Sequence, residues 1–303
     1  MKYREWLAEW LEYYVKPTVK ARTYEKYKRQ ATLYLSPCLG EYEIENLTPL
    51  YLQKFAASIT ESGLSPNTVN GIITSLQLSL RCAVQAGNAE HEYGKSVVRP
   101  KIREKKTECF SKEEQKKMEE YILKSNNMKL LGVVIALYTG LRIGELLALR
   151  WEDIDIRKGL ISVRQSCSDG WSKGKYKKFL DMPKTESSIR IVPLPQQLLP
   201  HIKELKKRTN SAYIIPGNTA YGAEIRCYQR TFGVVLKRLG IPHRGFHVLR
   251  HTFATRALEV GMDIRTLSEI LGHKNPAITL KRYAHSFIEH KVEMMNRLGK
   301  LLI

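Results

Sequence analysis

The sequence predicts two domains: an all-α N-terminal domain, followed by a mixed α+β domain that is mostly helical with a small antiparallel sheet of about three strands. Three observations predict this fold class. The 303 residues suffice for about two domains. Apolar residues recur at helical spacing over residues 1–98. Three short runs with alternating and β-branched residues then lie between 159 and 194, with helical patterns on both sides.

The predicted helices of the first domain, residues 1–98, carry clear start and end signals. Thr48 precedes Pro49 and Ser65 precedes Pro66, so each pair predicts an N-cap followed by proline in the first turn. The second of these helices runs to Gly87, a residue suited to a helix end. Aromatic residues at helical spacing near the N-terminus predict a packed core rather than a base-stacking platform. They are Trp6, Trp10, Tyr13 and Tyr14.

A basic segment at residues 99–107 interrupts the helical pattern. It contains Pro100 and has no apolar periodicity, which predicts an interdomain linker, either a solvated loop or a strap along a phosphate backbone. The second domain, residues 108–303, opens with Ser111 and Glu114 in a capping-box pattern. Its predicted elements are helices at 111–124 and 128–150, strands at 159–165, 176–183 and 188–194, and further helices from Gln196 onward.

The charge of the chain indicates a polyanionic partner. There are 50 Lys and Arg against 30 Asp and Glu, and after residue 106 the counts are 34 basic and 19 acidic. Counterion release favours nucleic acid over an anionic membrane surface as that partner. No apolar run approaches the ~20 residues of a bilayer span, and the charged N-terminus is unlike a signal peptide. We therefore expect a cytoplasmic, nucleoid-associated protein. Its five cysteines lack CxxC spacing and suggest neither a disulfide framework nor a zinc cluster.

Two segments of the second domain present basic residues at predicted element ends. In "TGLRIGE", Arg142 lies at the junction of two predicted helices, with Glu145 three residues on. This is either a local ion pair or an arginine beside helix N–H groups that already favour an anion. In "MPKTESSIRIVPL", Lys184 falls in the turn between two predicted strands, where a lysine is usually just solvated.

Two further segments complete the candidate site. Read as a helix, "HVLRHTF" places His247, Arg250 and His251 on one face, where like charges repel unless an anion lies between them. A guanidinium fork can hold two phosphate oxygens, and an imidazole can move a proton near neutral pH. In "LGHKNPAITLKRYAH", His273 follows a glycine and Tyr283 comes ten residues later. Each of these two would be structural if it stood alone.

Taken in order, "TGLRIGE", "KT(x)4R(x)2PL", "HxLRHTFAT", "LGH" and "RY" resemble the motifs of the tyrosine recombinases, the phage-integrase family. The resemblance covers the whole chain. It implies that residues 1–98 form the family's helical, SAM-like core-binding domain and residues 108–303 its catalytic domain. The sequence shows no small arm-binding domain ahead of the core-binding domain, so the resemblance is to bacterial integrases and recombinases that lack one.

The resemblance implies that the candidate residues act together on one scissile DNA phosphate. The implied roles are the nucleophile Tyr283, the phosphate clamp Arg142 and Arg250, the general acid Lys184, the acid/base His247, the phosphate-bonding His273, and the supporting residues Glu145 and His251. Fixed donors stabilise the charge on the phosphoryl oxygens. A phosphotyrosine conserves the energy of the broken bond. No metal, ATP or other cofactor is therefore expected.

The implied partners are double-stranded DNA core sites, three further copies of the chain in a tetramer on two paired sites, and accessory DNA-bending or directionality factors. The tail, about 286–303, has an apolar face that either packs on its own domain or docks on a neighbouring protomer, as the family favours. Two other functions compete with recombination. A type IB topoisomerase shares the chemistry without strand exchange. A non-catalytic regulator with paired helices would leave Lys184, His273 and Tyr283 unexplained together.

Overall fold

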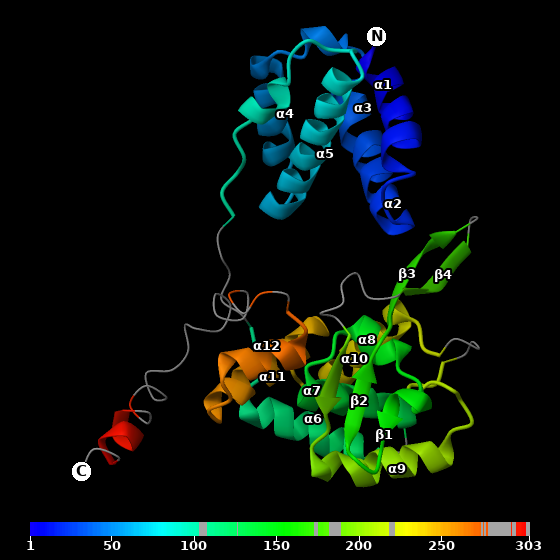
Figure 1. Ribbon diagram of the computed structural model, residues 1–303, viewed down its shortest axis with the longest axis vertical. Coiled ribbons are helices and arrows are strands. Elements are labelled where there is room, and N and C mark those ends of the chain that lie inside the picture. The colour runs from blue at the N-terminus through cyan, green and yellow to red at the C-terminus, as the bar shows by residue number, and fades with distance from the viewer. Residues whose placement is uncertain are drawn as a thin grey trace. The chain divides into compact units, whose positions relative to one another are not determined.

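The computed structural model describes residues 1–102, 108–125, 127–172, 175–181, 189–217, 222–273, 275, 277, 292 and 295–300. It divides the chain into two compact units, Met1–Lys105 and Lys106–Ile303 (Figure 1). Each unit has a hydrophobic core of its own. Among the described residues, no helix combines the length and the apolar character that a bilayer crossing requires.

The first unit is a bundle of helices, as predicted. Its α-helices are α1 (Tyr3–Glu9), α2 (Ala21–Gln30), α3 (Ser36–Leu39), α4 (Pro49–Glu61) and α5 (Pro66–Gln85). Two π-helical segments, Trp10–Val15 and Ala31–Leu35, continue α1 and α2. The predicted starts of the two longest helices are confirmed: α4 follows Thr48, and the Ser65 hydroxyl at the start of α5 accepts a hydrogen bond from the Thr68 backbone N–H at 3.2 Å.

The aromatic core of the first unit is confirmed for the tryptophans and wrong for the tyrosines. Trp6 and Trp10 are 1% and 0% exposed, whereas Tyr13 is 72% and Tyr14 37% exposed. The cause is the π-helical turn that begins at Trp10, because its hydrogen bonds span five residues rather than four. The next buried position is therefore Val15, which is 2% exposed.

The C-terminal end of the first unit is held on α5. The Arg99 guanidinium donates hydrogen bonds to the Asn70 carbonyl, the Thr74 hydroxyl and the Gln77 side-chain oxygen. The Asn70 side chain in turn donates to the Pro100 carbonyl at 3.1 Å. Two residues that the sequence assigned to the linker are thus fixed on the helical bundle, and the exact domain boundaries stay a prediction.

The described part of the second unit contains seven α-helices, one of which is apolar and central. They are α6 (Lys112–Lys124), α7 (Leu131–Thr139), α8 (Ile143–Ala148), α9 (Leu199–Arg208), α10 (Ile225–Arg238), α11 (His247–Glu259) and α12 (Ile264–Leu271). All of α7 except Tyr138 is buried, so this helix forms the centre of the core. It packs mainly against α11, which in turn contacts α12 (Figure 1).

The strands of the second unit form two small antiparallel sheets. One has the order β1-β2-β5, from β1 (Ile154–Asp155), β2 (Leu160–Val163) and β5 (Arg190–Pro193); the other pairs β3 (Ser166–Ser172) with β4 (Lys175–Asp181). The predicted three-stranded antiparallel sheet is confirmed, but its membership differs. The sequence SCSDGWS of β3 has no β-branched residue, and it forms a strand because it pairs with β4. Lys184, which was predicted to lie in the turn between two of these strands, is outside the described residues.

Candidate phosphate-binding site

The turn after α7 brings the "TGLRIGE" segment against two other helices. Gly140 ends α7 in the left-handed conformation, with φ +64°, and its N–H donates to the Ala136 carbonyl at 3.0 Å. A Cβ on Gly140 would lie 2.5 Å from Phe253 and 2.8 Å from Leu271, on α11 and α12. Only a glycine allows this approach, which places Arg142 beside the end of α12.

Arg142 begins α8 and holds Glu145 in two ways. Its backbone N–H donates to Glu145 Oε2 at 2.9 Å, which is half of a capping box. Its Nη1 donates to Oε1 of the same carboxylate at 2.8 Å. The Arg142 side chain remains 39% exposed, whereas that of Glu145 is 6% exposed. The predicted local pair therefore exists, with the carboxylate buried beneath a guanidinium that reaches solvent.

A second arginine binds the same carboxylate from β5. Arg190 donates from Nη1 to Glu145 Oε1 at 3.2 Å and from Nη2 to Oε2 at 2.9 Å. Burial alone would raise the pKa of Glu145, but the hydrogen bonds and charge of Arg190 and the charge of Arg142 outweigh it and lower the pKa to about 2. Glu145 is therefore a carboxylate at neutral pH, and it organises two guanidiniums.

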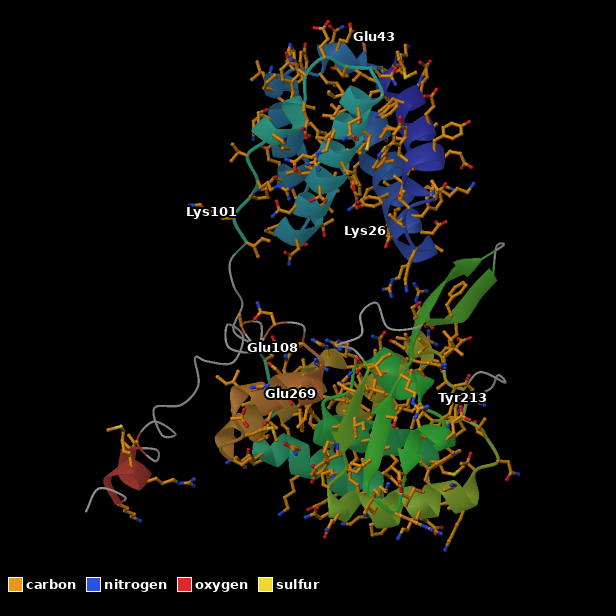
Figure 2. The ribbon with its side chains drawn as sticks, in the orientation of Figure 1. Lys26, Glu43, Lys101, Glu108, Tyr213 and Glu269 are labelled. Atoms are coloured by element: carbon orange, nitrogen blue, oxygen red, sulfur yellow. The ribbon has the colours of Figure 1, made fainter. Side chains whose placement is uncertain are left out.

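Helix α12 ends in a Schellman turn, which satisfies two of its last carbonyls. Gly272 is left-handed, with φ +65°, and its N–H donates to the Glu269 carbonyl at 3.1 Å. The His273 N–H donates to the Ser268 carbonyl at 3.0 Å, which completes the motif. Glu269 marks this helix in Figure 2. The carbonyls of Ile270 and Leu271 remain beyond the reach of this motif.

Three arginines supply the donors for these two carbonyls. Arg190 Nε donates to the Ile270 carbonyl at 2.6 Å. The Leu271 carbonyl accepts from Arg250 Nη2 at 2.6 Å and, at a longer 3.4 Å, from Arg142 Nη1. Cations at a helix C-terminus also complement its partial negative charge. The end of α12 is thus the point at which α8, β5 and α11 meet.

Arg250 connects both glycine turns. Besides its bond to Leu271, it donates from Nη1 to the Gly140 carbonyl at 2.8 Å, and the residue is 2% exposed. His247 and His251 come from the same helix and their rings are in contact, with centroids 4.5 Å apart. The helix predicted for this segment is confirmed. Its three basic side chains differ in burial, however, since His247 is exposed and His251 half-buried.

The structure therefore brings part of the predicted site together. Arg142, Glu145, Arg250 and the turn that carries His273 meet at the end of α12, and His273 itself is half-buried. Lys184 and Tyr283 lie outside the described residues.

The sequence motifs predicted no role for Arg190, the arginine of "KT(x)4R(x)2PL". A signal was present, because alternation along β5 puts Arg190 on the same face as the buried Val192, an unusual place for an arginine.

Comparison with known protein families identifies the chain. Residues 104–290 match the model of the phage integrase family, and residues 2–59 match that of the phage integrase N-terminal SAM-like domain. The chain belongs to the phage integrase family. It is accordingly an enzyme of the tyrosine recombinase class, whose general activity is site-specific DNA recombination.

Relatives of the phage integrase family align along nearly the whole chain. A tyrosine recombinase XerC-like protein of Caldanaerobacter subterraneus is 32% identical, over 97% of this chain and 82% of the relative. The ICEBs1 integrase of Bacillus subtilis is 28% identical, over 93% and 79%. The chain thus resembles both a Xer-type recombinase and the integrase of a mobile element.

Solved structures of integrases share the fold. The Tn1549 transposon integrase, in complex with a circular intermediate DNA, superposes with a TM-score of 0.82 at 23% identity, covering 98% of this chain and 99% of that one. A lambda integrase dimer bound to a COC′ core site gives a TM-score of 0.73 at 18% identity, covering 93% and 77%. These likenesses establish the two-domain integrase fold.

Proposed function

We propose that this recombinase cuts and rejoins duplex DNA through a 3′-phosphotyrosyl intermediate on Tyr283, with strand exchange between two sites and without metal or ATP. The observation that carries the proposal is the meeting of Arg142 and Arg250 on one carbonyl oxygen, that of Leu271. Two guanidiniums held side by side repel each other, and an anion between or upon them relieves the repulsion. A DNA phosphate is the anion that the net charge of +20 favours.

The proposed reaction is a pair of transesterifications. The Tyr283 oxygen attacks the scissile phosphorus, the bond from phosphorus to the 5′ oxygen breaks, and Lys184 gives that oxygen a proton. His247 takes the phenolic proton, and His273 donates a hydrogen bond to the phosphate. Rejoining reverses these steps with the 5′ hydroxyl of the partner strand, so the number of phosphodiester bonds is unchanged and no external energy is needed.

The roles of the two clamp arginines follow from their burial. Arg142, with its side chain 39% exposed, contacts the non-bridging oxygens directly. Arg250 is buried and fixed by two carbonyls, so it presents its charge without reorganisation. Glu145 holds Arg142 in place, and His251 supports His247 through their ring contact.

The proposed assembly is a tetramer on two paired core sites, aided by accessory DNA-bending or directionality factors. Residues 1–98 and 108–303 both contact the DNA, joined by the basic segment at 99–107. The tail from about 286 docks on a neighbouring protomer. Two of its apolar residues support this, because Met295 is 66% and Leu298 47% exposed and neither is packed in the core of its own unit. The remainder of that apolar face lies outside the described residues.

The proposal is tested by covalent capture. A library of duplex oligonucleotides with a randomised central region is incubated with the protein in EDTA, and SDS-resistant protein–DNA adducts are isolated and sequenced. We expect wild type to select one site and to carry it on a 3′ phosphate. Tyr283→Phe should bind the selected site about as well but yield no adduct, since a phenylalanine has no nucleophilic oxygen.

Two outcomes would contradict this mechanism. An adduct that persists in Tyr283→Phe would assign the nucleophile to another residue. An adduct that forms only with a divalent metal would show that the proposed metal-free mechanism is wrong. A strand-exchange assay on two duplexes with the selected site then separates recombination from a nicking and resealing topoisomerase. Recombinant products are expected, and relaxation of supercoils without them would favour the topoisomerase.

A further inference from the structure

Arg190 occupies an unusual position for an arginine on a strand. Its side chain is 6% exposed, and its guanidinium forms a bidentate ion pair with the Glu145 carboxylate. The third nitrogen, Nε, donates to the Ile270 carbonyl at the end of α12. A Cβ on Gly272 would lie 2.9 Å from Nη1 and 3.1 Å from Cδ of Arg190, so the turn before His273 rests directly on this side chain.

The charges around Glu145 link Arg190 to the phosphate site. Glu145 contacts two guanidiniums, those of Arg142 and Arg190, on its two oxygens. One carboxylate between two arginines leaves one net positive charge. Of the two arginines that pair with Glu145, Arg190 is buried, whereas the Arg142 side chain is 39% exposed. With Arg190 removed, the carboxylate would neutralise Arg142 instead, because a buried charge holds its remaining partner strongly.

We propose that Arg190 is a positioning residue for the recombination reaction. It acts as the counterion of Glu145, so that Glu145 orients Arg142 without cancelling the charge that Arg142 offers to the scissile phosphate. Its Nε bond at the same time fixes the α12 turn that carries His273. This inference rests on the proposed phosphotyrosine reaction and extends it to a residue that need not touch DNA.

The decisive comparison is between Arg190→Met and the pair Arg190→Met with Glu145→Gln. The single variant leaves a buried carboxylate opposite Arg142, and we expect single-turnover cleavage of the selected duplex to fall by at least about tenfold, as for loss of a residue that orients a reacting group. The pair removes both charges. It should cleave at least about threefold faster than the single variant, a coupling of the size that contacting residues show.

A second readout uses the charge of the substrate. A duplex with a methylphosphonate at the scissile position has one fewer anionic oxygen, so it depends less on the charge of Arg142. The deficit of Arg190→Met relative to wild type should therefore shrink on this duplex. Arg190→Lys keeps the positive charge but has no planar fork, and we expect it to cleave faster than Arg190→Met on the ordinary duplex.

Several outcomes would overturn the role of Arg190. They are an Arg190→Met variant that cleaves like wild type, a pair that cleaves no faster than the single variant, or an equal deficit on both duplexes. If Arg190→Met does not fold, the double variant is used alone, because it has no uncompensated buried charge. A folded double variant that cleaves no faster than Arg142→Ala would then reject the proposal. Wild type is measured throughout. If wild type forms no adduct that requires Tyr283, the proposed function fails, and not this inference alone.

Discussion

Among the described helices that end in the same backbone motif, α5 and α12 do so in different surroundings. In the first unit, α5 ends at Gly87, with φ +75°, and the Gly87 and Asn88 N–H groups donate to the carbonyls of Val84 and Ala83. In the second unit, α12 ends at Gly272 with the same pair of hydrogen bonds. Both are Schellman turns.

The difference lies in what meets each turn. A Cβ on Gly87 would have no atom within 4 Å, and the end of α5 is exposed. The end of α12 is contacted by arginines from three other elements, Arg142, Arg190 and Arg250. A helix end becomes a candidate site when distant parts of the chain bring cations to its last carbonyls. Its own local sequence does not decide this.

The largest loss of cleavage is expected from removing Arg250, which contacts the end of α12. Arg250→Ala leaves the Gly140 and Leu271 carbonyls without a buried donor. We expect cleavage of the selected duplex to fall by about 10²-fold or more, as for the loss of one preorganised donor. Affinity for the duplex should change much less, because many other phosphate contacts remain.

A matched control for Arg250 exists on α12 itself. Arg265 is 86% exposed and pairs with Glu269 at 3.2 Å on the surface of that helix. Such exposed pairs contribute little, so Arg265→Ala should cleave at nearly the wild-type rate. An Arg250→Ala variant that cleaves as fast as this control would show that Arg250 is structural.

The two glycines offer a more direct test of the comparison. Alanine at either position must adopt φ near +70°, which costs on the order of 1 kcal/mol in the free energy of unfolding. Gly87→Ala should lose this stability and nothing else. Gly272→Ala should in addition displace Arg190, which lies 2.9 Å from the new Cβ, and should slow cleavage by about tenfold.

Denaturant unfolding and single-turnover cleavage of the selected duplex, measured on both glycine variants, separate the two effects. The expected result is a similar loss of stability with a large difference in cleavage. Equal cleavage by Gly87→Ala and Gly272→Ala would mean that the α12 turn does not position the site.

Local signals in the sequence predicted the ends of elements well. Thr48 and Ser65 occupy the predicted N-cap positions, although only Ser65 makes a side-chain capping hydrogen bond. The stop at Gly87 and the capping box at Ser111 also occur as expected, because each depends on residues within four positions. Arg142, Glu145 and Arg250 were also found, through motifs whose order resembles a known family.

What the sequence did not reveal depends on long-range contacts. Arg190 and Glu145 are 45 positions apart, and their ion pair depends on how β5 packs against α12. The strand β3 has weak propensity and exists because β4 pairs with it. Tyr13 and Tyr14 were misassigned since a π-helical turn shifts the helical period, and no spacing rule anticipates that insertion.

Substitution of the N-cap residues of α5 and α12 should have similar effects, and these effects on cleavage are the smallest expected. Ser65 caps α5 by accepting from the Thr68 N–H at 3.2 Å, and Asp263 caps α12 by accepting from the Thr266 N–H at 2.9 Å. Ser65→Ala and Asp263→Ala should each cost about 1 kcal/mol in the free energy of unfolding. Neither should slow cleavage by more than about twofold, because the position of the α12 C-terminus is set by Arg190 and Arg250, which contact its last two carbonyls directly. The measurement is again unfolding with single-turnover cleavage of the selected duplex. A strong loss of cleavage in Asp263→Ala, but not in Ser65→Ala, would mean that the whole of α12 must be rigid for the site to form, and that the arginines alone do not hold its end.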